Sequence, residues 1–165
     1  MATLMQFLQT IPQFADFNQS ELAAFEKAFR VETFADGHVF MNEGDRADAM
    51  YLILEGEIEV RRRRKNKAGY ALIDRKRAGE IVGLISLINN EKHGATAVAV
   101  GAVQAASLPQ SAFELLFDTH APIALHFQRL IARQLARDVR RFNRALRTAV
   151  RSDAVGATIT TFGSD

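Results

Sequence analysis

The chain has 165 residues, of which 48% are hydrophobic, and this is enough for one domain to bury its own core. It contains no cysteine, which excludes a disulfide framework, an iron–sulfur centre and a thiol nucleophile. No apolar stretch approaches the roughly 20 residues needed to cross a bilayer, and the first ten residues lack the features of an export signal. We therefore expect a protein without a transmembrane segment that resides in the cytoplasm.

The charge is unevenly distributed along the chain. Residues 1–120 carry 13 Lys or Arg against 16 Asp or Glu, whereas residues 121–165 carry 8 against 3. A basic C-terminal segment is typical of a solvated helix face, and also of a contact with an acidic partner.

The first 30 residues are predicted to be helical. Their apolar residues recur at three- and four-residue steps, and Pro12 interrupts the pattern, so we expect two helices with a break at Ile11-Pro12. Asn18 or Ser20 can cap the second helix by accepting from its free amide groups. Glu21 suits the first turn, where the helix dipole favours an anion.

Residues 31–110 change to a strand pattern. Short apolar runs are separated by Gly, Asn and Asp, which predicts an antiparallel sandwich or barrel. Glu55-Gly56 is interpreted as a two-residue hairpin turn because glycine accepts the positive φ that such turns require. Further corners are expected at Gly37, Gly44 and Gly69. The predicted strand runs are residues 39–41, 50–54, 58–60, 70–73, 97–100 and 103–108.

Residues 111–150 return to a helical pattern, with a short helix at 111–116 and a long one from about Pro122 to Val150. The last residues, 151–165, have little apolar periodicity and are predicted to form a flexible tail. The domain is thus expected to cover residues 1–150.

The long helix carries an apolar seam next to a stripe of arginines. Steps of four and three predict a two-helix coiled coil and hence a homodimer, and the alternative is packing on the chain's own barrel. The stripe, which includes Arg133, Arg137 and Arg144, also suits an acidic protein partner. The seam consists of Leu135, Val139, Phe142, Leu146 and Ala149.

A glycine-rich segment at residues 79–97, called the cassette below, carries the main functional signal. Gly79 to Ser86 is predicted to turn from a strand into a short helix whose first amide groups have no partner. An anion such as a phosphate satisfies such groups and suits the helix dipole.

The cassette, the glycine corners before it and the long helix after it resemble the cyclic nucleotide-binding domains, the family seen in the catabolite activator protein and the protein kinase A regulatory subunit. The matching segments are Ala35 to Asp45 and Met50 to Val60, followed by the cassette. The resemblance implies an eight-stranded antiparallel jelly roll with N-terminal helices, and a long C-terminal helix that covers the ligand pocket or pairs with a partner. It also implies these ligand-binding residues: Val82, Gly83, Leu84, Ile85, Ser86, Lys92, His93, Gly94, Ala95 and Thr96.

Two positions depart from the family. Members that bind cyclic AMP usually have Glu directly after the cassette glycine and Arg a few residues later, and here these positions are Leu84 and His93. Leu84 accepts no hydrogen bond, and Lys92 lacks the planar fork with which Arg grips a phosphate. Losing two charge-assisted hydrogen bonds weakens binding on the order of 10²- to 10⁴-fold. The site is therefore expected to hold cyclic nucleotide weakly, to take another small anion, or to have no ligand.

The basic run at residues 61–67 has two readings, a solvated hairpin tip or a phosphate-binding surface. No helix-turn-helix follows the long helix, so direct DNA binding is not expected. No metal-ligand set, nucleophile elbow or P-loop occurs in the sequence, so we expect neither a metal nor catalysis.

These observations lead to two functional hypotheses. The first is a stand-alone regulatory or sensor module whose C-terminal helix responds to a cyclic nucleotide or other small anion. The second is a ligand-free dimerisation or interaction module that acts through the apolar seam and the arginine stripe.

Overall fold

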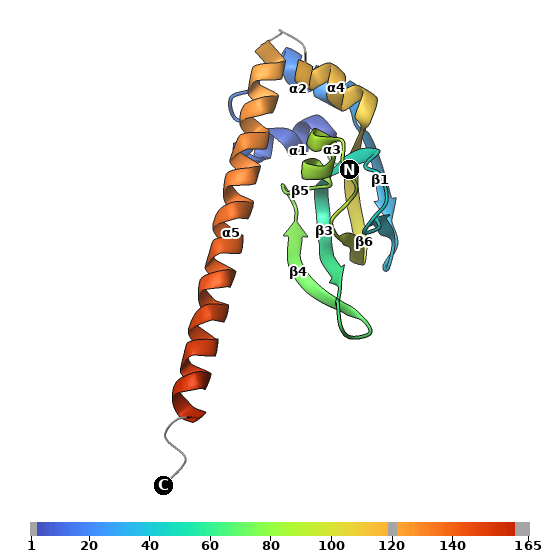
Figure 1. The fold of residues 1–165 in the computed structure, drawn as a ribbon. Helices are drawn as coiled ribbons and strands as arrows, with labels where there is room; N and C mark the ends of the chain where they lie inside the picture. The colour runs from blue at the N-terminus through green and yellow to red at the C-terminus, as the bar shows by residue number, and fades with distance from the viewer. Residues whose placement is uncertain (1–2, 119–121, 161–165) are drawn as a thin grey trace. The chain divides into compact units, whose positions relative to one another are not determined.

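The computed structural model describes residues 3–118 and 122–160 (Figure 1). The chain divides into two compact units, residues 1–130 and residues 131–165. The first unit contains all the strands and most of the helices, and the second contains the rest of the long terminal helix. The single domain expected over residues 1–150 stays a prediction.

The N-terminal residues form α1 (Leu4–Thr10), a 3-10 turn (Pro12–Phe14) and α2 (Gln19–Ala28). The predicted break at the proline is confirmed. Asn18 caps α2: its Oδ1 accepts from the Glu21 amide at 2.9 Å, and Glu21 Oε2 accepts from the Asn18 amide at 2.9 Å. This reciprocal pair satisfies two groups that the helix start leaves without partners.

One antiparallel sheet follows, with the strand order β1-β6-β3-β4, in which β2 also pairs with β6 and β5 with β3. Two long strands, β3 and β6, therefore form its centre, and their residues pair from Ala49 with Pro109 to Arg61 with Thr96. The strands are β1 (Arg30–Phe34), β2 (Val39–Met41), β3 (Ala49–Arg63), β4 (Tyr70–Arg77), β5 (Ile81–Val82) and β6 (Thr96–Pro109).

The described residues contain six strands, so the expectation of eight is wrong. Of the six strand runs predicted from the sequence, two pairs are continuous, and β1 and β5 are strands that these runs did not include. The runs at 50–54 and 58–60 belong to β3, and the runs at 97–100 and 103–108 belong to β6.

Glu55-Gly56 is accordingly not a hairpin turn. Both halves of β3 pair with β6, and the register shifts between Ile53 and Glu55 and again between Glu55 and Glu57. Gly56 has φ 91° at this bulge. A Cβ atom there would lie 2.5 Å from the Ala102 carbonyl oxygen, so both the backbone conformation and the close approach of β6 require glycine.

Three helices follow the first strands: α3 (Leu84–Asn89), α4 (Gln110–Asp118) and α5 (Pro122–Thr160). The predicted end of the long helix near Val150 is wrong, since α5 continues to Thr160. No proline stands in residues 151–160, and a single helical glycine costs only about 1 kcal/mol. The flexibility predicted for residues 151–165 stays untested, and the last five of them lie outside the described residues.

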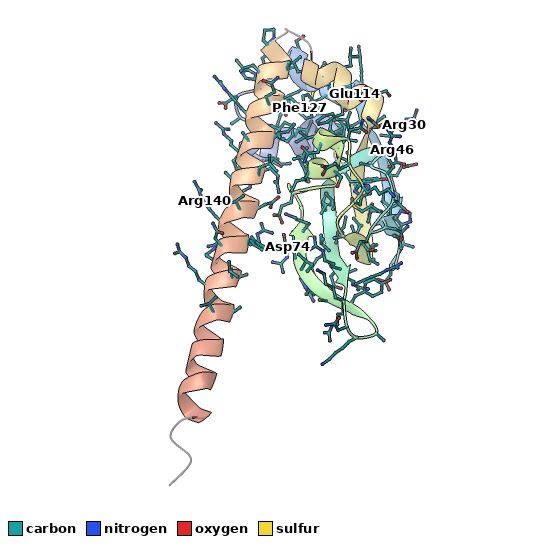
Figure 2. The ribbon with its side chains drawn as sticks, viewed as in Figure 1. Arg30, Arg46, Asp74, Glu114, Phe127 and Arg140 are labelled. Atoms are coloured by element: carbon teal, nitrogen blue, oxygen red, sulfur yellow. The ribbon has the colours of Figure 1, made fainter. Side chains whose placement is uncertain are left out.

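The first unit has a sheet core and a helical core. The sheet core centres on Ile53 and Ile58 of β3 and on three alanines of β6, Ala97, Ala99 and Ala105. The helical core is aromatic. Phe127, labelled in Figure 2, packs edge to face on Phe25 and Phe113, and Phe25 packs in the same way on Phe14. The ring centroids of these pairs are 5.3 to 5.8 Å apart. The sheet and the helices of the first unit thus each have a packed interior.

Candidate functional site

The backbone of the cassette has the conformation predicted from its sequence. Strand β5 ends at Val82, Gly83 follows in the left-handed region with φ 83°, and α3 begins at Leu84. A Cβ atom at Gly83 would lie 3.0 Å from both the Ala49 carbonyl oxygen and Met41 Cε, so glycine is needed there. No side chain caps α3, which leaves its first amide groups for another acceptor.

The side chains at the start of α3 point in different directions. Val82 and Leu84 are each only 4% exposed, whereas Ile85 is 55% exposed and Ser86 is half-buried. Leu84 therefore belongs to the packed interior. It offers no hydrogen bond at the position where members of the resembled family that bind cyclic AMP usually have a glutamate.

His93 is the most buried polar side chain of the cassette. It is 5% exposed, and Nδ1 is buried with no hydrogen-bond partner in the described part of the chain. Its backbone is fixed, since its amide donates to the Asp45 carbonyl and its carbonyl accepts from the Gly44 amide, both at 2.8 Å. Burial lowers the pKa of His93, although Asp48 and Asp45 act in the opposite direction. The imidazole is thus neutral near pH 7 and brings no positive charge to the site.

The remaining predicted ligand residues are the neighbours of His93 in the sequence, Lys92 before it and residues 94–96 after it. Lys92 and Gly94 are exposed, and Ala95 and Thr96 are half-buried. The Thr96 hydroxyl accepts from the Glu43 amide at 3.0 Å, which joins the end of the cassette to the loop after β2. The ten predicted residues thus fall in two runs, 82–86 and 92–96, on either side of the end of α3, and Val82 pairs with Tyr51 of β3 whereas Thr96 pairs with Arg61.

Two arginines that were not predicted as site residues reach the cassette from other parts of the chain. Arg62 Nε donates to the Gly94 carbonyl oxygen at 2.9 Å. Arg46, labelled in Figure 2, donates from Nη2 to Asn90 Oδ1 at 3.3 Å. The two-residue period of β3 places Arg62 on the same face as Ile58, but its contact with Gly94 depends on the register between β3 and β6, which the local sequence does not indicate. Nothing in the sequence around Arg46 indicates its contact.

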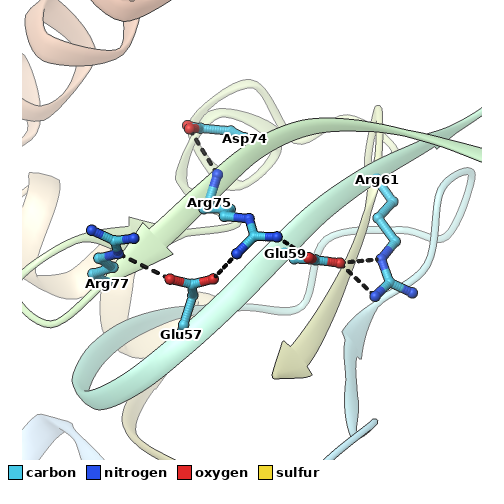
Figure 3. A network of polar contacts seen from close by, with 6 residues as sticks. All are labelled: Glu57, Glu59, Arg61, Asp74, Arg75 and Arg77. Carbon is cyan, nitrogen blue, oxygen red and sulfur yellow. Dashed lines mark hydrogen bonds and ion pairs between the residues drawn. The ribbon is translucent and has the colours of Figure 1, made fainter. Parts of the chain in front are cut away.

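The opposite face of β3 carries a network of ion pairs with β4 (Figure 3). Glu57 accepts from Arg75 at 2.7 Å and from Arg77 at 2.9 Å, and Glu59 accepts from Arg61 Nε at 2.8 Å. The hydrogen bond from Arg77 is the main reason that the pKa of Glu57 is lowered. Arg61, the first residue of the basic run, is therefore paired with a carboxylate.

The apolar seam of α5 is largely exposed. Val139, Phe142 and Leu146 are 58%, 65% and 52% exposed, and Leu135 is half-buried. Among the arginines of the stripe, Arg133 and Arg144 are exposed, and Arg137 is half-buried and donates from Nη2 to Gln134 Oε1 at 2.7 Å. None of the helices in the described part of the chain is long and apolar enough to cross a membrane.

Comparison with known proteins identifies a matching family and related proteins. Residues 31–120 match the family described as "Cyclic nucleotide-binding domain". The cAMP-dependent protein kinase regulatory subunit of Mycosarcoma maydis is 27% identical over 103 residues, which are 62% of this chain and 19% of that protein. The lysophospholipase nte1 of Neosartorya fischeri is 32% identical over 100 residues, which are 60% of this chain and 6% of the enzyme. The chain thus spans about a fifth or less of the length of these relatives.

A solved structure of a cyclic nucleotide-binding domain from Methylobacillus flagellatus has the same fold. It superimposes with a TM-score of 0.77 at 24% identity, over 88% of this chain and 82% of that one. The family match over residues 31–120 covers more than half of the sequence. This chain therefore belongs to the cyclic nucleotide-binding domain family.

Proposed function

We propose that this domain is a non-catalytic regulatory module in which a small anionic ligand of the cyclic nucleotide type binds at the cassette. The observation that carries the proposal is the start of α3, where a left-handed Gly83 leads into a helix whose first amide groups have no side-chain cap. These groups suit an anion. The absence of a carboxylate at Leu84 and of a charged side chain at His93 predicts weaker binding of cyclic AMP than family members with those groups achieve.

The regulatory part of the proposal concerns α5. A ligand changes the position of a helix only if it binds the two arrangements with different affinity. We propose that occupancy of the cassette biases the position of α5, and that this in turn alters the contact of α5 with a partner.

Calorimetric titration tests the ligand hypothesis. The purified protein is titrated with cyclic AMP, cyclic GMP and cyclic di-GMP, and we expect saturable heat with at least one of them. Ser86→Ala removes a hydroxyl from the first turn of α3 and should weaken that binding about 2- to 10-fold, the value of one neutral hydrogen bond. Ser111→Ala removes an exposed hydroxyl from the first turn of α4 and serves as the matched control. No heat with any ligand at millimolar concentration contradicts the hypothesis.

The coupling to α5 is tested with a pair of labels. The chain has no cysteine, so Gln9→Cys and Asn143→Cys introduce two unique attachment points at exposed positions. Spin-label distances should change when the ligand that gave heat is added. An unchanged distance distribution at saturation contradicts the coupling.

The second candidate is an interaction module that keeps the sheet for structure and acts through α5. Its specific support is the exposure of Val139, Phe142 and Leu146 on one side of the helix. A second copy of the chain would cover this seam, and an acidic protein would instead follow the arginines beside it. Under this hypothesis, changes in the seam abolish assembly and Ser86→Ala leaves function unchanged.

A further inference from the structure

Arg62 occupies a position that differs from those of its neighbours in the basic run. Ile58 is fully buried in the sheet core, and side chains two and four residues later in a strand lie on the same face. Arg62 is four residues later, and its contact with the Gly94 carbonyl agrees with this placement. Arg61 lies on the opposite face, where Glu59 pairs with it. Of these two adjacent arginines, Arg62 is the one directed to the cassette.

The hydrogen bond to Gly94 leaves most of the guanidinium available. It uses Nε, and in the part of the chain that the structure describes it is the one hydrogen bond of the Arg62 guanidinium. Both terminal nitrogens therefore keep their donors. The bond at Nε holds the side chain in place. The guanidinium therefore loses less rotational freedom when its terminal nitrogens bind a second group.

Gly94 lies beside this guanidinium. A Cβ atom at residue 94 would lie 3.4 Å from Arg62 Nη2, which is about van der Waals contact, and the backbone at Gly94 does not have a positive φ. The backbone conformation therefore gives no reason for glycine there. A Cβ atom there would touch the guanidinium, which is the end of a flexible side chain and can shift by a small distance.

The other basic groups of the cassette are less suited to an anion. His93 is neutral and buried, and Arg46 uses one terminal nitrogen on Asn90. Lys92 is exposed and carries a point charge without the planar fork that binds two oxygens of a phosphate.

We propose that Arg62 donates through its terminal nitrogens to the phosphate of the ligand at the cassette. It replaces, from a neighbouring strand, the arginine that family members carry at the position of His93. This inference rests on the proposed function, and it adds the residue that makes the site selective for a phosphate over an uncharged nucleoside.

The test compares cyclic AMP with adenosine, which has the same base and sugar but no phosphate. Affinities of the full chain for both compounds are measured by calorimetry, or by competition if the affinity is low. We expect Arg62→Ala to weaken cyclic AMP about 10- to 100-fold, the value of a hydrogen bond to a charged group, and to leave adenosine within about twofold. Arg62→Lys, which keeps the charge but loses the fork, should fall between the two.

Arg63→Ala is the matched control, because it removes the same charge from the next residue, which the strand period places on the opposite face. It should change the affinity for cyclic AMP by less than about threefold, since exposed charges are screened by salt. An affinity ratio between cyclic AMP and adenosine that is the same in Arg62→Ala as in the unaltered protein overturns the inference. An equal loss in Arg63→Ala overturns it too.

The two proposals fail in different ways. If the unaltered protein binds no cyclic nucleotide, the proposed function is wrong and the role of Arg62 falls with it. If the unaltered protein binds cyclic AMP and Arg62→Ala binds it equally well, the proposed function stands and only the role of Arg62 is wrong.

Discussion

Gly56 shows how one residue determines the path of the longest strand. Its φ of 91° lies in the left-handed region, and a Cβ atom there would lie 2.5 Å from a carbonyl oxygen of β6. Gly69 has a similar φ of 94°, but nothing lies within 4 Å of the space where its Cβ atom would be. Comparing substitutions at the two glycines therefore separates the free-energy cost of a left-handed backbone from the cost of a close contact.

We predict that Gly56→Ala lowers the free energy of unfolding by about 2 to 5 kcal/mol, because left-handed strain adds to a displacement of β6. Gly69→Ala should cost about 1 to 2 kcal/mol, the strain alone. Urea unfolding of both variants measures the difference. Equal losses would show that the approach of β6 does not matter.

His93 makes stability depend on pH in a defined direction. Burial lowers its pKa below the value of about 6.5 expected in the unfolded chain. Below pH 6.5 the unfolded chain therefore binds this proton more readily than the folded protein does. The stabilising effect of the neutral imidazole is complete above pH 6.5 and is lost as the pH falls towards the folded-state pKa.

We predict that the free energy of unfolding falls between pH 7.5 and pH 5.5, with a contribution from His93 of at most about 1.4 kcal/mol per pH unit. His93→Gln should flatten the profile over this interval, because glutamine does not titrate. Denaturant unfolding at several pH values provides the measurement. A profile of the same slope in His93→Gln would assign the effect to another histidine.

At the scale of single elements, the helix boundaries that depend on local hydrogen bonds were predictable. Asn18 precedes Glu21 by three residues, and this spacing alone is enough to predict the cap at the start of α2. Residues 39–41 were predicted as a strand and form β2. In each case the residues that determine the element lie within a few positions of one another.

The paths of β3 and β6 were not predictable from local sequence. A glycine with positive φ is compatible with a hairpin turn and with a bulge, and which one Gly56 adopts depends on whether a single partner strand passes both halves. That partner, β6, begins 40 residues after Gly56. The same dependence explains why Arg62 was missed, since its contact with Gly94 follows from the register of two strands distant in sequence.

The cassette has features of both kinds, those that the local sequence predicts and those that depend on packing against distant parts of the chain. Its conformation was predicted from the glycines, and the burial of Leu84 and His93 was not. Burial depends on the packing of α3 and of the following segment against the first unit. For this reason the sequence identified which charged groups are missing, and the structure was needed to find a cationic group nearby.

At the scale of the whole molecule, the exposed seam of α5 predicts self-association. Phe142 is 65% exposed, and a coiled-coil partner would cover it. We predict that Phe142→Glu abolishes a dimer detected by sedimentation equilibrium, because two carboxylates would be placed in the seam. Thr148→Glu changes the charge equally at an exposed position that the helical period places away from the seam, and it should leave the dimer intact.

Either of two results would contradict this prediction. The first is that the unaltered protein sediments as a monomer at concentrations of about 100 μM, and the second is that Phe142→Glu assembles as well as Thr148→Glu. In the first case, an acidic protein becomes the better partner for the arginine stripe.

Because successive side chains of a strand lie on opposite faces, β3 also places neighbouring arginines of the basic run in different environments. Four consecutive arginines read as one patch in the sequence, yet the odd-numbered Arg61 is neutralised by Glu59 and the even-numbered Arg62 meets the cassette. Inserting or deleting one residue between Gly56 and Arg61 would exchange the two environments, because a shift of one position turns every later side chain to the other face. Because the run contains four arginines, such a shift would still place an arginine in the position of Arg62. Its main effect, when the change directly follows Gly56, would be to turn Glu57 and Glu59 away from Arg75 and Arg77 of β4.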